Sequence, residues 1–126
     1  MKDVLFRGKR IDNFEWVEGY FVSYEDETYI FQQDQVNYGI DLGGYLDCCK
    51  MNEVVSSTVG QYTGLTDKNG TKIFEGDIVK IDGKDYEVKY MLGQFFVGIN
   101  MPIAYKRFDC EVIGNIHDNP ELLTTK

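Results

Sequence analysis

The chain has 126 residues, which is enough for one ordinary domain or two very small ones. Hydrophobic residues make up 43% and charged residues 27%, values typical of globular proteins that argue against intrinsic disorder. The net charge of −8 argues against non-specific nucleic-acid binding, because a negative surface repels the phosphate backbone.

The first predicted elements are strands at residues 4–7 and 14–24. In the second strand, ring-bearing and aliphatic side chains fall on one face of an alternating pattern: Phe14, Trp16, Tyr20 and Val22. Gly19 interrupts this strand, which predicts a bulge or a bend. The acidic run of Glu25, Asp26 and Glu27 predicts a turn into a return strand at residues 28–31, so the two strands form a hairpin.

Residues 32–57 predict no single structure. One interpretation is a short strand at residues 36–40 followed by a helix over residues 41–55, indicated by the spacing of Leu42, Leu46 and Cys49. The adjacent glycines Gly43 and Gly44 weaken the helical interpretation, because glycine destabilises a helix interior. We therefore expect mixed structure in this segment.

In the second half, residues 58–62 and 76–81 predict strands, with a tight turn between them at residues 67–70. Asn69 and Gly70 accept positive φ, and the Asp67 side chain can accept a hydrogen bond from the downstream backbone. A calcium-binding EF-hand loop is excluded here, because it requires glycine at its sixth position and this segment has glycine at the fourth.

Glycine-containing turns separate three more predicted strands, at residues 86–90, 95–99 and 111–117. Residues 118–123 predict one helical turn, with Asn119 as the N-cap and Pro120 at the first helical position. Short strands at this spacing indicate a small barrel or sandwich. We therefore predict an all-β protein with little helix, built from two β subdomains: residues 1–57, and residues 58–126 as an SH3-like β-barrel.

No targeting or membrane-spanning segment is visible in the sequence. The first apolar run breaks after three residues, and no run approaches the ~18–20 apolar residues that cross a bilayer. Three cysteines, of which Cys48 and Cys49 are adjacent, make a poor disulfide framework. The acidic neighbours of Cys110 should raise the pKa of its thiol, which argues against a nucleophile. We expect a cytoplasmic protein with reduced thiols and no membrane contact.

Several segments carry a recognisable pattern of residues: TVGQYTGL at 58–65, DKNG at 67–70, IFEGDIV at 73–79 and EVIGNIHDNPELL at 111–123, with FRGKR at 6–10 and WVEGY at 16–20. This pattern resembles the YopX family over nearly the whole chain. Such proteins are encoded by bacteriophages and prophages, are mostly β and have no established biochemical activity. The resemblance therefore implies a phage-derived protein and supplies no catalytic residue. One departure from the family pattern is His117, where an aromatic residue such as tyrosine is expected.

Catalysis is not expected from the residues themselves. The chain has one histidine, so every histidine-based dyad must use His117. Its neighbour Asp118 would point to the opposite face of an extended chain and would not orient the imidazole. We therefore expect no enzymatic activity, no metal site and no cofactor.

A protein-interaction role fits these features best, with a host or phage protein as the partner. Residues 1–62 contain eleven acidic residues against five Lys and Arg, which offers an electrostatic surface to a basic partner. The candidate interaction surface consists of Glu25, Asp26, Glu27, Tyr90, Tyr105 and Arg107. Because each predicted subdomain has a marginal core, we also expect a homo-oligomer.

The alternative function is binding of single-stranded nucleic acid by the second half of the chain. Aromatic and cationic residues are interleaved there: Tyr86, Tyr90, Phe95 and Tyr105 with Lys80, Lys84, Lys89, Lys106 and Arg107. Aromatic side chains in a basic groove can stack on successive bases. The competing explanation is ordinary strand packing, with the rings in the core and the lysines in solvent.

Overall fold

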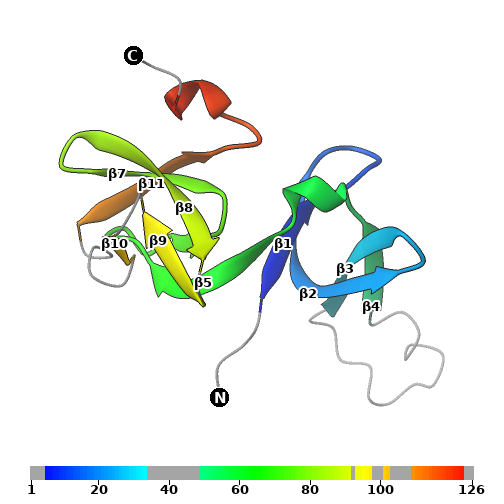
Figure 1. Ribbon diagram of the computed structural model, residues 1–126. Coiled ribbons are helices and arrows are strands. Elements are labelled where there is room, and N and C mark those ends of the chain that lie inside the picture. Colours follow the sequence, from blue (N-terminus) through cyan, green and yellow to red (C-terminus); the bar gives the residue numbers. More distant parts are fainter. Residues whose placement is uncertain (1–4, 34–48, 92, 98–100, 103–108, 124–126) are drawn as a thin grey trace. The chain divides into compact units, whose positions relative to one another are not determined.

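The computed structural model describes residues 5–33, 49–91, 93–97, 101–102 and 109–123 (Figure 1). Strands make up most of the described part, with two short 3-10 turns, which confirms the predicted all-β class. The chain divides into two compact units, Val4–Gly60 and a unit that begins at Gln61. The predicted strand at 36–40 and residues 41–48 of the alternative helix lie outside the described residues, and the helical interpretation is wrong for residues 49–53, which form a strand.

Four antiparallel strands form the sheet of the N-terminal unit, in the order β4-β3-β2-β1. Their bounds are β1 Phe6–Lys9, β2 Trp16–Tyr24, β3 Glu27–Gln33 and β4 Cys49–Glu53, followed by the 3-10 turn η2 at Ser56–Thr58. Beyond β4 the chain returns to the end of β1, where Arg10 and Val54 form an antiparallel bridge. The amide of Val55 also donates to the carbonyl of Lys9 at 2.8 Å. These bonds curl the sheet toward a small barrel.

One face of this curled sheet forms the core of the N-terminal unit. Ile30 and Val54 are buried on it, and the rings of Phe6 and Phe21 meet at 5.3 Å. Gly19 is required by close packing, since a Cβ there would lie 2.3 Å from the carbonyl oxygen of Phe31. The ladders of β2 with β1 and β3 show no register shift at Gly19, so in place of the predicted bulge the glycine permits a close approach between the backbones of β2 and β3.

The C-terminal unit contains a five-stranded antiparallel sheet in the order β10-β9-β8-β7-β11 and a two-stranded β5–β6 ladder. The strands are β5 Gly60–Thr66, β6 Lys72–Phe74, β7 Asp77–Ile81, β8 Lys84–Met91, β9 Gln94–Val97, β10 Met101–Pro102 and β11 Cys110–Asn115, with the 3-10 turn η4 at Pro120–Leu123. No ladder joins β10 to β11 within the described ranges, so the SH3-like barrel predicted for this half is not closed. Its core contains Ile73, Val79, Ile81, Val88, Val97 and Cys110.

The predicted turn at residues 67–70 is present and is organised by the carboxylate of Asp67. One oxygen accepts the amides of Asn69 and Thr71 at 2.8 and 2.9 Å. The other accepts the amide of Val112 on β11 at 2.8 Å. Asp67 therefore builds the turn and also attaches it to a strand far along the sequence.

A second set of polar contacts ends the C-terminal unit. The Asn115 side-chain oxygen accepts the amides of His117 and Asp118, both at 2.9 Å. Asn119 precedes η4 as predicted, but its side-chain oxygen accepts the amide of Asn115 at 3.2 Å instead of capping the turn. The motif at 111–123 is therefore explained by local hydrogen bonding at the end of β11.

Candidate interaction surface

The outer face of the N-terminal sheet is rich in aromatic side chains. Residues that lie opposite each other in an antiparallel ladder share a face, and the face alternates along each strand. Tyr20 lies opposite Phe31, and Phe31 lies opposite Met51. The alternation places seven apolar side chains on this surface, which we call the aromatic face: Trp16, Tyr20, Val22, Tyr24, Tyr29, Phe31 and Met51.

Several members of the aromatic face are well exposed to solvent. Tyr24 is 64% exposed, and Tyr20 and Met51 are each 51% exposed. The same strands bury Ile30 on their other face, so the sheet carries apolar side chains on both faces. This pattern is typical of sheets that are covered on both sides, and a contiguous exposed apolar patch marks an interaction site. The aromatic face is therefore the candidate functional surface.

Two cations lie beside Trp16 at one end of the aromatic face. The guanidinium carbon of Arg7 is 4.6 Å and the Nζ of Lys9 is 5.6 Å from the centroid of the indole ring. Lys9 lies directly opposite Trp16 in the β1–β2 ladder. Each such cation–π contact is worth about 0.5–1 kcal/mol when exposed, so the two side chains favour one position of the indole.

Acidic side chains lie at the other end of the face, where β2 turns into β3. The hydroxyl of Tyr29 donates a hydrogen bond to the carboxylate of Glu27, and Glu53 lies opposite Tyr29 in the ladder. The hydrogen bond to Glu27, with burial and the charges of Glu27 and Glu53, raises the pKa of Tyr29 to about 12. Tyr29 is therefore neutral near pH 7, and the carboxylates alone supply the charge at this end.

The structure brings together three of the predicted site residues, at this acidic end. Glu25 and Asp26 form the two-residue turn between β2 and β3, with φ values of 48° and 68°, and Glu27 begins β3. Tyr24 pairs with Glu27 across this turn, and positive φ at both central residues is the geometry of a type I′ hairpin. The predicted acidic tip therefore adjoins the aromatic face.

The other predicted site residues belong to the second half of the chain. Tyr90 lies on β8 of the C-terminal unit, half-exposed, with its ring 4.8 Å from that of Phe95. Tyr105 and Arg107 lie outside the described residues.

Two of the four aromatic residues proposed for nucleic-acid binding serve the core of the C-terminal unit. Tyr86 and Phe95 pack against its buried cluster. Lys80 forms an ion pair with Asp85 at 2.8 Å. Lys89 precedes Tyr90 on β8, so the two side chains lie on opposite faces of the strand. Core packing is therefore the correct explanation for Tyr86 and Phe95, while Tyr105 and Lys106 lie outside the described ranges.

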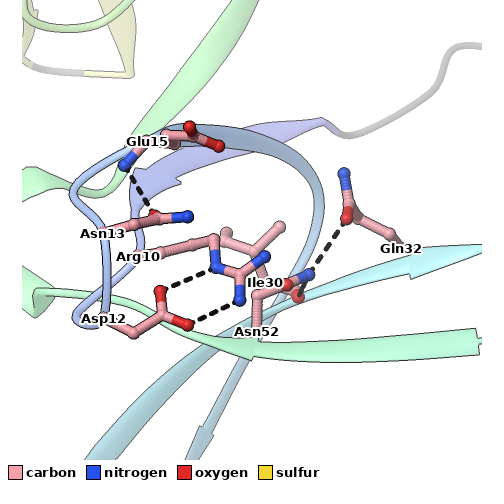
Figure 2. Close-up of polar contacts among 7 residues, drawn as sticks. All are labelled: Arg10, Asp12, Asn13, Glu15, Ile30, Gln32 and Asn52. Carbon is pink, nitrogen blue, oxygen red and sulfur yellow. Dashed lines mark hydrogen bonds and ion pairs between the residues drawn. The ribbon is translucent and has the colours of Figure 1, made fainter.

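The loop between β1 and β2 adjoins the cationic end of the aromatic face and has a defined structure (Figure 2). Arg10 donates to both carboxylate oxygens of Asp12, at 3.0 and 2.7 Å. This contact lowers the pKa of Asp12 and raises that of Arg10. The side-chain oxygen of Asn13 accepts the amide of Glu15 at 2.9 Å. Figure 2 also shows Asn52 linking β4 to Gln32 of β3, at 3.0 Å.

Metal sites, membrane-spanning helices and reactive thiols find little support in the described part of the chain. There, no group of three or more His, Cys, Asp or Glu side chains is placed to hold a metal ion. No helix in the described ranges has the length and hydrophobicity needed to cross a bilayer. Burial, followed by the charge of Asp67, raises the pKa of the Cys110 thiol. The direction agrees with the prediction, but burial rather than an adjacent acid is the main cause.

The sequence contained part of the signal for the aromatic face. The alternation in the sequence correctly places Trp16, Tyr20 and Val22 on one face, but it does not connect them with Tyr29 and Phe31 on the return strand. Phe14 was wrongly included in the strand: β2 begins at Trp16, and Phe14 has a left-handed backbone with φ of 59°. Nothing in the sequence indicates this conformation, because it is rare for a bulky residue.

Comparison with known proteins places this fold in a family. The chain is similar over 98% of its length to the crystal structure of protein EF1440 from Enterococcus faecalis, with 25% identity, a TM-score of 0.59 and 99% of that chain covered. None of the curated proteins compared matches the chain. The family model described as "YopX protein" matches residues 5–124. The chain therefore belongs to the YopX family.

Proposed function

We propose that this chain is a phage- or prophage-encoded, non-catalytic protein-interaction module that binds a partner protein on its aromatic face in the cytoplasm of the bacterial host. The observation that carries the proposal is the exposure of Tyr20, Tyr24 and Met51 on the outer face of a sheet whose inner face already forms a core. Tyr, Trp, Met and Arg are the residue types enriched at protein interfaces, and all four occur on or beside this face.

The charges around the aromatic face indicate the chemistry of the partner. Arg7 and Lys9 lie beside Trp16, and Glu27 lies at the opposite end of β2, beside the β2–β3 turn. A partner surface with acidic groups facing the first end and basic groups facing the second would match this distribution. Such complementarity orients a partner and speeds its association, while the central rings supply the buried area.

Single-stranded nucleic acid is the second candidate ligand, and one observation favours it. The indole of Trp16, flanked by two cations, and the exposed rings of Tyr20 and Tyr24 offer stacking surfaces for bases. Carboxylates on the same face weigh against it, because Glu18, Glu27 and Glu53 would repel phosphates. We therefore favour a protein partner.

The test is capture from a lysate of the bacterial host by the immobilised chain. The wild-type chain is compared with Tyr20→Ser/Tyr24→Ser, which removes two exposed rings from the aromatic face. Tyr90→Ser is the matched control, because Tyr90 is a similarly exposed ring in the C-terminal unit. We expect the same captured protein with wild type and with the control, and its loss with the double variant.

Equal capture by all three chains, or no capture by wild type at low and moderate salt, would contradict the proposal. A labelled single-stranded oligonucleotide is titrated in parallel at low salt. Binding that weakens as salt rises, and that the double variant loses, would favour the second candidate instead. Thermal unfolding of each variant confirms that it is folded.

A further inference from the structure

The β1–β2 loop holds its tip residues in one arrangement. The amide of Phe14 donates to the carbonyl of Arg10 at 3.0 Å, and the amide of Arg10 donates to the carbonyl of Glu15 at 2.9 Å. The amide of Ile11 donates to the carbonyl of Glu53 at 3.1 Å, which attaches the loop to the end of β4. Together with the Arg10–Asp12 ion pair in Figure 2, these bonds constrain the loop at both ends.

Within this constrained loop, Phe14 combines an unfavourable backbone conformation with an exposed side chain. Its φ of 59° lies in the left-handed region, which is unfavourable for a residue with a side chain. Its side chain is 62% exposed, so little burial compensates for that cost. Ile11 of the same loop is 47% exposed. Strain retained at an exposed bulky residue is a reason to look for a function.

We infer that Phe14 is an anchor side chain that inserts into an apolar pocket of the protein bound on the aromatic face, with Ile11 packing at the pocket rim. This inference rests on the proposed function. The loop follows Lys9 directly and ends at Trp16. These two residues lie opposite each other on the aromatic face, so a partner that covers its cationic end also meets the loop. A rigid loop reduces the entropy lost when the ring is buried, which favours tight binding.

A protein pocket fits this loop better than a membrane surface. Interfacial membrane anchors combine apolar residues with clustered cations that attract anionic lipids. Here the one cation of the loop, Arg10, is paired with Asp12, and Glu15 adds a negative charge. The net charge of −8 would add repulsion from an anionic bilayer.

The test uses the protein captured through the aromatic face, purified and titrated with the chain. Phe14→Gly and Phe14→Asn relieve the backbone strain and remove the ring. We expect both variants to raise the melting temperature by a few degrees, on the order of the strain released. We expect each to weaken binding at least about tenfold, as for a central interface anchor. Phe14→Leu, which keeps an apolar side chain, should retain part of the affinity.

The matched control is Asp82→Gly, which relieves a left-handed residue with φ of 53° in the C-terminal unit. It should leave the affinity within about twofold of wild type, the scatter expected of a distant surface substitution. Affinity unchanged in Phe14→Gly and Phe14→Asn, while Tyr20→Ser/Tyr24→Ser still abolishes capture, would overturn this inference and leave the proposed function standing. A lower melting temperature in both variants would contradict the claim that the backbone of Phe14 is strained. If wild type captures nothing, both proposals fail.

Discussion

At the scale of single residues, Asp67 shows how one carboxylate can fix two segments. Its oxygens accept three backbone amides, from Asn69, Thr71 and Val112. Burial favours the neutral acid, but these hydrogen bonds outweigh it and lower the pKa of Asp67 below its ordinary value. The charged form is therefore the one that stabilises the fold.

The substitution Asp67→Asn keeps the shape of the side chain but replaces one acceptor oxygen with a donor group. We expect it to lower the free energy of unfolding by about 2 kcal/mol near neutral pH, because at least one buried amide loses its acceptor. Chemical denaturation of both chains measures this difference. Asp85→Asn, which breaks a surface ion pair with Lys80, is the control and should change stability less.

The effect of Asp67 should also depend on pH. Because the pKa is lower in the folded state, the stabilisation is complete above the unfolded pKa of about 3.8 and is lost as the pH falls through the lower folded pKa. We expect the difference between wild type and Asp67→Asn to shrink below about pH 4. A difference that stays constant from pH 7 to the acid limit would show that the charge of Asp67 does not matter.

Tyr29 offers a second test at this scale. Its pKa of about 12 results first from the hydrogen bond to Glu27. Comparing the phenolate absorbance of wild type with that of Tyr29→Phe isolates its titration, and Glu27→Gln should bring the pKa back toward about 10. Since the folded pKa is raised, this contribution to stability is complete below pH 10 and is lost as the pH rises through about 12. Titration of Tyr29 near pH 10 in wild type would contradict the hydrogen bond.

At the scale of elements, the pairing of β2 with β3 depends on Gly19. A Cβ at this position would lie 2.3 Å from the backbone carbonyl oxygen of Phe31, which cannot rotate away as a flexible side chain could. We expect Gly19→Ala to destabilise the N-terminal unit by about 2–4 kcal/mol, because the strands must separate locally. Urea unfolding of both chains measures this loss of stability. Ser23→Ala, exposed on the same strand, is the control, and an equal effect in both variants would refute the close approach.

The sequence predicted those elements whose signals are local. The turn at residues 67–70 follows from short polar side chains and glycine, which act on their own backbone. The bond from Val112 to Asp67 joins residues 45 positions apart, and no local pattern predicts it. The closed barrel predicted for the C-terminal unit is not found among its described strands for the same reason, because closure depends on which distant strands pair. Sequence periodicity also overextended β2 to include Phe14, whose backbone is set by the loop's hydrogen bonds.

The candidate site could be predicted only in part. The acidic turn at Glu25 and Asp26 has a local signature, and the structure places it beside the aromatic face. The aromatic face itself requires the register that sets Tyr20 opposite Phe31 and Phe31 opposite Met51. Met51 lies 20 residues beyond Phe31, across a segment with no clear periodicity, so its membership could not be inferred.

At the scale of the whole molecule, we propose that the chain forms a homo-oligomer. Each of its two units is small, and a unit of about 60 residues buries a smaller fraction of its surface than a larger domain does. Association of copies would add buried apolar area to these marginal cores. We expect light scattering at tens of micromolar to report a mass above that of one chain. A monomer mass across the whole concentration range would refute the oligomer without affecting the aromatic face.

The proposed function requires that a protein covers the aromatic face in the cell, and site-directed photo-crosslinking tests this most directly. A photoreactive phenylalanine analogue replaces Tyr24 in one chain and Tyr90 in another, since both rings are exposed but only Tyr24 lies on the aromatic face. After irradiation in the bacterial host, we expect a discrete protein adduct at position 24 and none at position 90. The account is contradicted if position 24 gives no adduct, or if both positions give the same adducts in equal yield.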